Sequence, residues 1–156
     1  MKSEIAFLSV DQVLAIHQRG IDEHGGSTEL SDRGLLESAA AMPRAQFAGE
    51  FLHAGPPTMA AAYLFHLCKN HPFVDGNKRV AIATAETFVL LNDHELVATD
   101  DELIHLTLGV ADGSISKDEA IAFFRKHVRS AKSVKAKREA AAKPAKRSPP
   151  RRKKSS

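Results

Sequence analysis

Apolar residues along this chain fall into runs with helical spacing, and the runs are separated by glycine, proline and short polar segments. Three runs follow a Ser or Thr with Gln or Glu three residues later, the capping-box pattern that marks a helix start. These pairs are Ser9 with Gln12, Thr99 with Glu102, and Ser116 with Glu119. The pattern predicts an all-α fold, with helices at about residues 10–19, 32–42, 58–70, 78–91, 100–110 and 117–129.

The expected elements are not all amphipathic helices. The helix at 78–91 is apolar nearly all round, and such a helix belongs in the centre of a domain. Residues 46–57 instead contain two glycines, two prolines and the alternating Phe47 and Phe51, which predicts a loop or a short β-hairpin flap. Short β segments are also expected at 4–8 and 96–99.

Composition is typical of a single domain with a substantial core, since 43% of the 156 residues are apolar. The one cysteine, Cys68, lies within an apolar helical run, so we expect a buried thiol rather than a nucleophile. The N-terminus lacks the charged start and apolar middle of a signal sequence, and no run reaches the roughly 20 apolar residues of a membrane span. We therefore expect a cytoplasmic protein without membrane contact.

The formal net charge of +3 conceals two regions of opposite charge. Residues 131–156 contain 11 of the 22 Lys and Arg residues and one of the 19 acids, so their charge is +10 and that of residues 1–130 is −7. The basic stretch is poor in apolar bulk and rich in Lys, Ala, Pro and Ser, which predicts a disordered tail after a domain at 1–130. The tail either binds nucleic acid without sequence preference or is a solubilising extension that folds back onto the acidic domain.

The segment HPFVDGNKR, at residues 71–79, gathers reactive and charged side chains between two apolar helical runs. Pro72 disfavours helical geometry at His71, so the preceding helix is expected to end there and to present the imidazole. Histidine can be neutral near pH 7 and accept a proton from an attacking hydroxyl. Phe73 is expected to plug into the core and fix the loop, as an anchor and not as a reactant.

The second half of this segment has the residue types of an anion-binding helix start. Gly76 can adopt positive φ, and the helix that begins near Asn77 or Lys78 points its free N–H groups at the same place. Asp75 supplies a hard oxygen suited to Mg²⁺, which takes one or two carboxylates together with substrate phosphates. Lys78 and Arg79 put positive charge where the helix dipole disfavours it, so a bound anion is the natural compensation. Each feature alone is common in caps, turns and surfaces, but together they predict a phosphate-handling site.

HPFVDGNKR resembles the Fic/Doc (Fido) signature, and Lys78 is the variant of the Doc branch, the "death on curing" toxins of toxin–antitoxin pairs. The likeness continues in HGGSTELSDRGLLESAAAMPR at 24–44, FVLLNDHEL at 88–96 and LTLGVADGSISKDEAIAFFRK at 106–126, so it covers roughly residues 5–130. The resemblance implies a compact Fido-type helical bundle with a central catalytic helix.

The resemblance also implies roles for the residues of the signature. His71 is then the general base and Asp75 the Mg²⁺ ligand. The cradle for the phosphates of ATP is then formed by Gly76, Asn77, Lys78 and Arg79.

The function implied by the resemblance is transfer of a phosphoryl group from ATP to a hydroxyl of a target protein, a translation factor such as elongation factor Tu, with growth arrest as the effect. AMP transfer to a protein hydroxyl is the alternative, but Fic AMP-transferases commonly carry a second arginine where this chain has Ile82. A different class of function is a nucleic-acid-binding module that acts through the basic tail. Self-inhibited Fic proteins carry a Ser or Thr followed four residues later by Glu and then by Gly or Asn. This chain contains no such segment, so we expect a separate antitoxin protein.

Other polar residues are expected to be structural. The remaining histidines make no zinc spacing with one another or with cysteine, so surface or capping roles are expected for them. They are His17, His24, His53, His66, His94, His105 and His127. The acids at 100–102 lie in the first turn of an expected helix, where negative charge favours the dipole.

Overall fold

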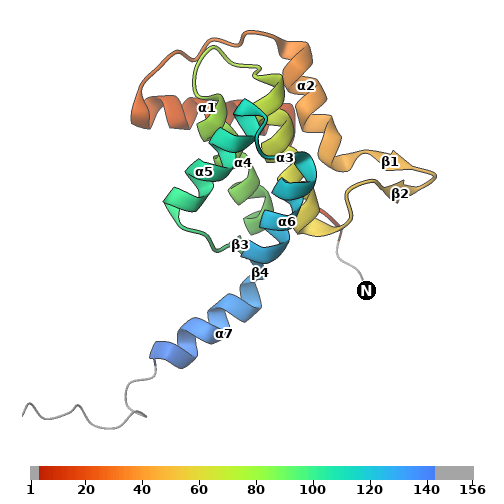
Figure 1. Ribbon diagram of the computed structural model, residues 1–156, viewed down its shortest axis with the longest axis vertical. Coiled ribbons are helices and arrows are strands. Elements are labelled where there is room, and N and C mark those ends of the chain that lie inside the picture. Colours follow the sequence, from red (N-terminus) through yellow and green to blue (C-terminus); the bar gives the residue numbers. More distant parts are fainter. Residues whose placement is uncertain (1–3, 143–156) are drawn as a thin grey trace, which may run out of the picture.

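The computed structural model describes residues 4–142 and confirms the all-α class (Figure 1). The described helices are α1 (Val10–His24), α2 (Arg33–Ala41), the 3₁₀ helix η1 (Met42–Arg44), α3 (Gly55–Asn70), α4 (Asn77–Leu91), α5 (Asp100–Asp112), α6 (Lys117–His127) and α7 (Ala131–Ala142). The described strands are β1 (Gln46–Phe47), β2 (Glu50–Phe51), β3 (His94–Leu96) and β4 (Val128–Ser130). Within these residues, no helix combines the length and the hydropathy needed to cross a membrane.

The three predicted capping boxes are confirmed at the starts of α1, α5 and α6. In each, the Ser or Thr hydroxyl accepts from the backbone N–H three residues on, and the Gln or Glu side chain accepts from the cap's own N–H. Helix α1 is longer than predicted and ends at His24, where Gly25 follows with φ 85°. The caps set where these helices start, but the extra turn of α1 is set by packing against its neighbours.

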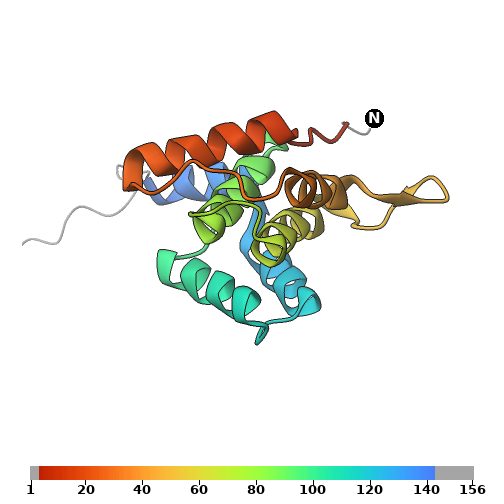
Figure 2. The ribbon, with the colours of Figure 1, turned by 90° about the horizontal axis from the view of Figure 1, so that it is seen from above.

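Helices α3 and α4 form the centre of the domain (Figure 2). Helix α1 packs against α4 and α2 packs against α3, whereas α5 and α6 pack against the central pair from the other side. Tyr63 on α3 and Phe88 on α4 are fully buried, with ring centroids 5.1 Å apart. The predicted central position of α4 is therefore confirmed, although Leu90 and Leu91 at its C-terminal end are exposed.

Within the segment predicted as a loop or flap, residues 46–51 form the β1–β2 hairpin, which projects from the body of the domain (Figure 1). The last three residues of that segment, 55–57, instead belong to α3. Ala48 and Gly49 make its turn with φ of 54° and 83°, the backbone twist that a two-residue hairpin turn favours. Phe47 at its tip is 75% exposed, whereas Phe51 contacts the ring of Phe7 with centroids 5.7 Å apart. One side of the hairpin base thus packs on the domain, and the tip is left free.

Strand predictions were partly wrong. Residues 4–8 form no strand; the backbone N–H of Leu8 instead donates to the buried hydroxyl of Tyr63 at 2.8 Å. The strand expected at 96–99 occurs two residues earlier, as β3, and pairs with β4 in antiparallel register. The helix expected at 117–129 therefore ends at His127, and residues 128–130 form β4, because their backbone groups pair with those of β3.

The prediction of a disordered tail is wrong for its first twelve residues, which form helix α7. This segment, AKSVKAKREAAA, consists mostly of Ala, Lys and Arg, which favour helix. Its start is held by the Ala131 N–H, which donates to the Asp93 carbonyl at 2.8 Å. Further along the helix, Arg138 forms an ion pair of 2.7 Å with Glu95. The rest of the tail, 143–156, lies outside the described residues, and the domain division at residue 130 stays a prediction.

Candidate active site

Helix α3 ends where the sequence predicted, and His71 follows it in the left-handed conformation, with φ 50° and ψ 55°. Its backbone N–H still donates to the Leu67 carbonyl at 3.2 Å, which closes the helix end. A non-glycine residue in this conformation carries a cost of roughly 1–2 kcal/mol. Strain of this kind persists where surrounding contacts fix the backbone, and it is common at functional sites. The imidazole of His71 is exposed at this turn.

The anchors of the loop are Phe73 and Asn77, both buried. The Asn77 side chain accepts from the Phe73 N–H at 2.9 Å and donates to the Phe73 carbonyl at 2.7 Å. The prediction that Phe73 plugs into the core is confirmed by its 1% exposure. The amide of Asn77 thus closes the loop, and its backbone N–H lies at the start of α4, where a phosphate cradle would form.

A neighbouring segment, residues 27–32, holds the loop from outside. Ser31 and Asp32 donate their N–H groups to the Pro72 carbonyl at 2.7 and 3.1 Å, and Val74 donates to the Glu29 carbonyl at 3.0 Å. These bonds tie the loop to the turn before α2. The position of His71 is therefore set by segments on both sides of the motif.

His17 also supports the loop, a role that the sequence analysis missed. This buried side chain stacks on Phe73 with ring centroids 3.7 Å apart and an interplanar angle of 8°. Its Nε2 lies 2.7 Å from the carbonyl oxygen of Asp75, so this nitrogen carries the proton and donates. The surface or capping role expected for His17 is wrong. Its spacing of four from Val13 and Ile21, both buried on α1, is the signal that could have placed it inside.

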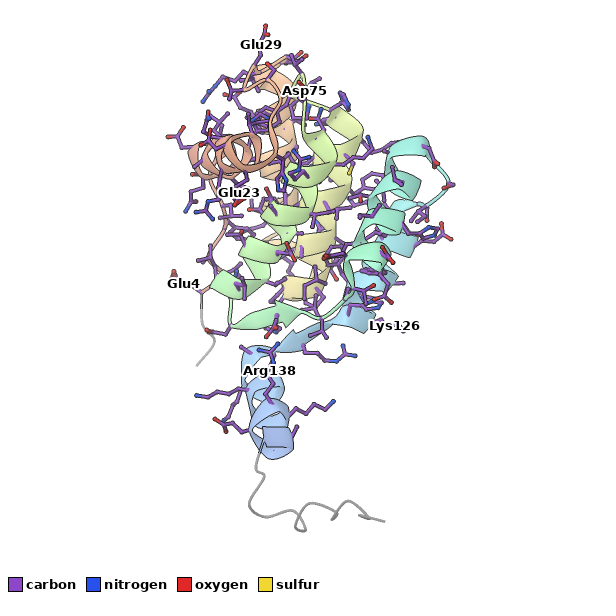
Figure 3. The ribbon with its side chains drawn as sticks, turned by 90° about the vertical axis from the view of Figure 1, so that its left-hand side faces the viewer. Glu4, Glu23, Glu29, Asp75, Lys126 and Arg138 are labelled. Carbon is purple, nitrogen blue, oxygen red and sulfur yellow. The ribbon has the colours of Figure 1, made fainter. Side chains whose placement is uncertain are left out.

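Asp75 is exposed at the end of the bundle opposite α7 (Figure 3). Its Oδ2 accepts from the Ser27 N–H at 2.9 Å, which orients the carboxylate. A Cβ at Gly26, where φ is +117°, would lie 3.6 Å from the same oxygen, so the glycine leaves the approach to Asp75 clear.

The residues present fit Mg²⁺ held mainly by water and phosphate oxygens. No group of three or more His, Cys, Asp or Glu side chains within residues 4–142 could form an all-protein metal cage. Asp75 offers one oriented carboxylate, and Mg²⁺ commonly takes one or two carboxylates with substrate phosphates and water.

The start of α4 has the geometry of an anion site. Gly76 has φ 80°, and a Cβ there would approach His17 Nε2 to 3.4 Å, so both backbone and packing favour glycine. The Val80 N–H makes the first bond of the helix, to the Gly76 carbonyl at 2.9 Å, so the preceding N–H groups have no acceptor in the helix. Lys78 and Arg79 are exposed there, and the first turn contains no acid.

One pocket of about 370 Å³ brings together all the predicted site residues. It is lined by Gly25, Gly26, His71, Val74, Asp75, Gly76, Asn77, Lys78 and Arg79. A proton acceptor, a carboxylate and a cationic helix start thus open on the same space. That arrangement can bind a phosphate chain beside a base.

Other titratable groups lie outside this pocket. Cys68 is buried, and burial raises its thiol pKa to about 11, as expected for an unreactive cysteine. Burial and the nearby Lys117 lower the pKa of His66 to about 4, and the two side chains meet at 3.0 Å. His53 is buried too, so its predicted surface role is wrong. Thr99 and Glu102 form a cap, as predicted for that acidic turn.

The sequence is similar to a known protein family and to two characterised proteins. The model of the Fic/DOC family matches residues 7–89, more than half of the chain. Toxin Doc of Mycolicibacterium smegmatis is 43% identical over 77 residues, which are 49% of this chain and 59% of that protein. Protein kinase doc of Escherichia phage P1 is 33% identical over 109 residues, 70% of this chain and 85% of that protein. The match therefore spans less than two thirds of the mycolicibacterial toxin and most of the phage protein.

The chain belongs to the Fic/DOC family. The matched residues include the whole of the candidate active-site loop, residues 71–79.

Proposed function

We propose that this chain is a Doc-like protein kinase that transfers the γ-phosphoryl group of ATP to a hydroxyl of a target protein. The target is a translation factor such as elongation factor Tu, and the effect is growth arrest. The observation that carries the proposal is the single pocket shared by His71, Asp75 and the start of α4. The names of the two relatives, a toxin and a protein kinase, support the same class.

Phosphate binding falls to the start of α4. Its first N–H groups and the dipole of the helix favour an anion, and Lys78 and Arg79 add two cations at the same place. Gly76 lets the phosphate chain approach the backbone because no side chain intervenes. Asp75 faces the same space with an oriented carboxylate that can hold Mg²⁺. When bound, this ion neutralises charge on the phosphate oxygens.

His71 acts as the general base. As its ring nitrogen takes the proton of the target hydroxyl, the hydroxyl oxygen forms a bond to the γ-phosphorus. The bond from that phosphorus to the oxygen bridging it to the β-phosphorus breaks, and ADP leaves. The exposure of His71 at the pocket edge allows a protein hydroxyl to reach it.

AMP transfer is the second candidate within this class. There the hydroxyl attacks the α-phosphorus and pyrophosphate leaves. ATP must therefore bind with its α-phosphorus, instead of its γ-phosphorus, beside His71. Fic AMP-transferases commonly use a second arginine at the position of Ile82. Ile82 is apolar and packs against the core, so it offers no charge to the anion, which favours phosphoryl transfer.

We propose further that a separate antitoxin inhibits the enzyme with a helical segment. A hollow of about 170 Å³ lies between α1 and α4 and shares Gly76 and Arg79 with the active-site pocket. A helix-in-groove complex there would cover the phosphate-binding residues. Expression of the chain alone should arrest growth, and co-expression of the neighbouring reading frame should restore it. Normal growth of cells that express the folded chain alone would count against the toxin proposal.

ATP labelled on either the γ- or the α-phosphorus separates the two reactions. With elongation factor Tu as substrate, we expect label on the protein from γ-labelled ATP and none from α-labelled ATP. The opposite pattern assigns the chain to AMP transfer. Absence of label from both, with folded chain and Mg²⁺ present, contradicts this target.

A further inference from the structure

A second charged surface begins inside the folded domain and continues along α7. Between residues 125 and 138 the sequence contains seven Lys or Arg residues and no acid. The C-terminal basic surface is defined here as the exposed side chains of Arg125, Lys126, Arg129, Lys132, Lys135 and Lys137. Its residues belong to the last turn of α6, to strand β4 and to helix α7. All of them follow the residues that the family model matches, 7–89.

Two acids lie near this surface, since Glu139 follows Lys135 by one turn of α7 and both line a hollow with Glu95. None of its six side chains forms an ion pair with an acid among residues 4–142. The neighbouring Arg138 is paired with Glu95, at 2.7 Å, and this pair attaches α7 to β3. The structure therefore attaches α7 to the domain, while the surrounding cations stay without an acidic partner and Arg129 donates only to the Val128 carbonyl, at 3.2 Å.

The chemistry of α7 favours a polyanion with many regularly spaced charges. A helix that binds a membrane surface needs large apolar side chains on one face, whereas the apolar residues of α7 are alanines and a single valine. No aromatic residue that could stack on a base occurs in residues 125–142, except for the imidazole of His127, which stacks on Phe123. Lysines without base-reading partners match the phosphate backbone of nucleic acid.

The position of the surface keeps it clear of the active site. The pocket lies at the N-terminal end of α4. Strand β3 follows the C-terminal end of the same helix and pairs with β4, which leads into α7. With 15 residues, α4 separates the two ends by about 20 Å. Figure 3 shows Asp75 and Arg138 at opposite ends of the molecule.

We propose that the C-terminal basic surface binds the phosphate backbone of nucleic acid without reading its sequence, and holds the protein there while the opposite pocket remains open. This goes beyond the kinase function and does not depend on it.

Matched pairs of substitutions in the full chain test the proposal. Arg125→Gln with Lys126→Gln, and Lys132→Gln with Lys135→Gln, each remove two charges from the surface. Arg33→Gln with Lys69→Gln removes two exposed charges elsewhere and is the control. The probes are a labelled random-sequence DNA duplex and a labelled single-stranded RNA, titrated between about 50 and 200 mM salt.

We expect each surface pair to weaken binding to both probes by about tenfold near 100 mM salt and to lower the salt slope by about one to two. The control pair should leave binding unchanged. Equal losses from surface and control pairs, or no binding by the parent chain at low salt, overturn the proposal. So does tighter binding to anionic lipid vesicles or to polyglutamate than to the nucleic acids.

Two further measurements complete the test. Replacement by Gln of the seven Lys and Arg residues in 143–156 should leave part of the binding; if it removes all of it, the described surface is not the site. A fluorescent ATP analogue should bind equally well with and without saturating duplex, and competition between the two ligands contradicts the separation of the sites. Failure of ATP to bind in either case overturns the kinase function alone.

Discussion

In the loop at residues 71–79, Asn77 and Asp75 have fixed partners, whereas the C-terminal basic surface consists of exposed cations. Asn77 bonds both backbone groups of Phe73, and Asp75 is held at its carbonyl by His17 and at its carboxylate by Ser27. Within residues 4–142 the side chains of the basic surface form no ion pair, and Arg129 donates only to the carbonyl of its neighbour Val128, at 3.2 Å. We therefore expect the proposed catalysis to depend on the identity of single residues in the loop, and the proposed binding at the basic surface to depend on how many charges it presents.

The largest effect is expected at His71. Substitution by Ala or Asn should reduce the rate of phosphoryl transfer by about 10² to 10⁴, the usual contribution of a general base. Asn tolerates the left-handed conformation of this position, so His71→Asn should fold with the parent's stability. Initial rates and thermal unfolding of both variants check this. A rate within about threefold of the parent would contradict the assignment of His71 as the general base.

Asp75→Asn should abolish Mg²⁺-dependent turnover. The amide keeps an oxygen that can accept from the Ser27 N–H, so the loop should survive while the negative charge is lost. Turnover measured against Mg²⁺ concentration checks this, with Glu29→Gln on the adjacent segment as the control. If Asp75→Asn and the parent respond to Mg²⁺ alike, the ion is held by another group.

Asn77→Ala should act through stability. It leaves the N–H and the carbonyl of buried Phe73 without partners, and each unsatisfied buried group costs about 1–3 kcal/mol. Urea unfolding should show this loss, whereas Asn70→Ala, which removes one exposed bond to the Leu35 carbonyl, should cost about 1 kcal/mol or less. Equal losses in the two variants would show that the buried pair does not hold the loop.

The smallest effect is expected at the attachment of α7. Arg138→Gln breaks the pair with Glu95, but the Arg138 side chain is 69% exposed. Exposed ion pairs contribute about 0–1 kcal/mol, so the free energy of unfolding should change by less than 1 kcal/mol and catalysis should not change. A loss of several kcal/mol would mean that α7 belongs to the cooperative core.

Local signals made much of the fold predictable. Capping boxes depend on residues three apart, and the end of α3 depends on the dipeptide at His71 and Pro72, so these features can be seen in the sequence. The same holds for the site residues, which lie within one segment of nine and line one pocket.

The remaining features depend on contacts between distant segments. The stacking of His17 on Phe73 and the place of Gly26 beside Asp75 require α1 and the following turn to meet the loop. The charge of α7 indicated disorder, but its Ala and Lys content and the attachment through Glu95 favour a helix. Composition alone did not show which of these effects is larger.

The central claim, that His71 serves a phosphotransferase, is tested most directly by the intact mass of elongation factor Tu. After incubation with the chain, ATP and Mg²⁺, the target should gain the mass of one phosphoryl group, and with His71→Asn it should gain none. A gain of the mass of AMP, an unchanged target with the parent chain, or full modification by the His71→Asn variant would contradict the account.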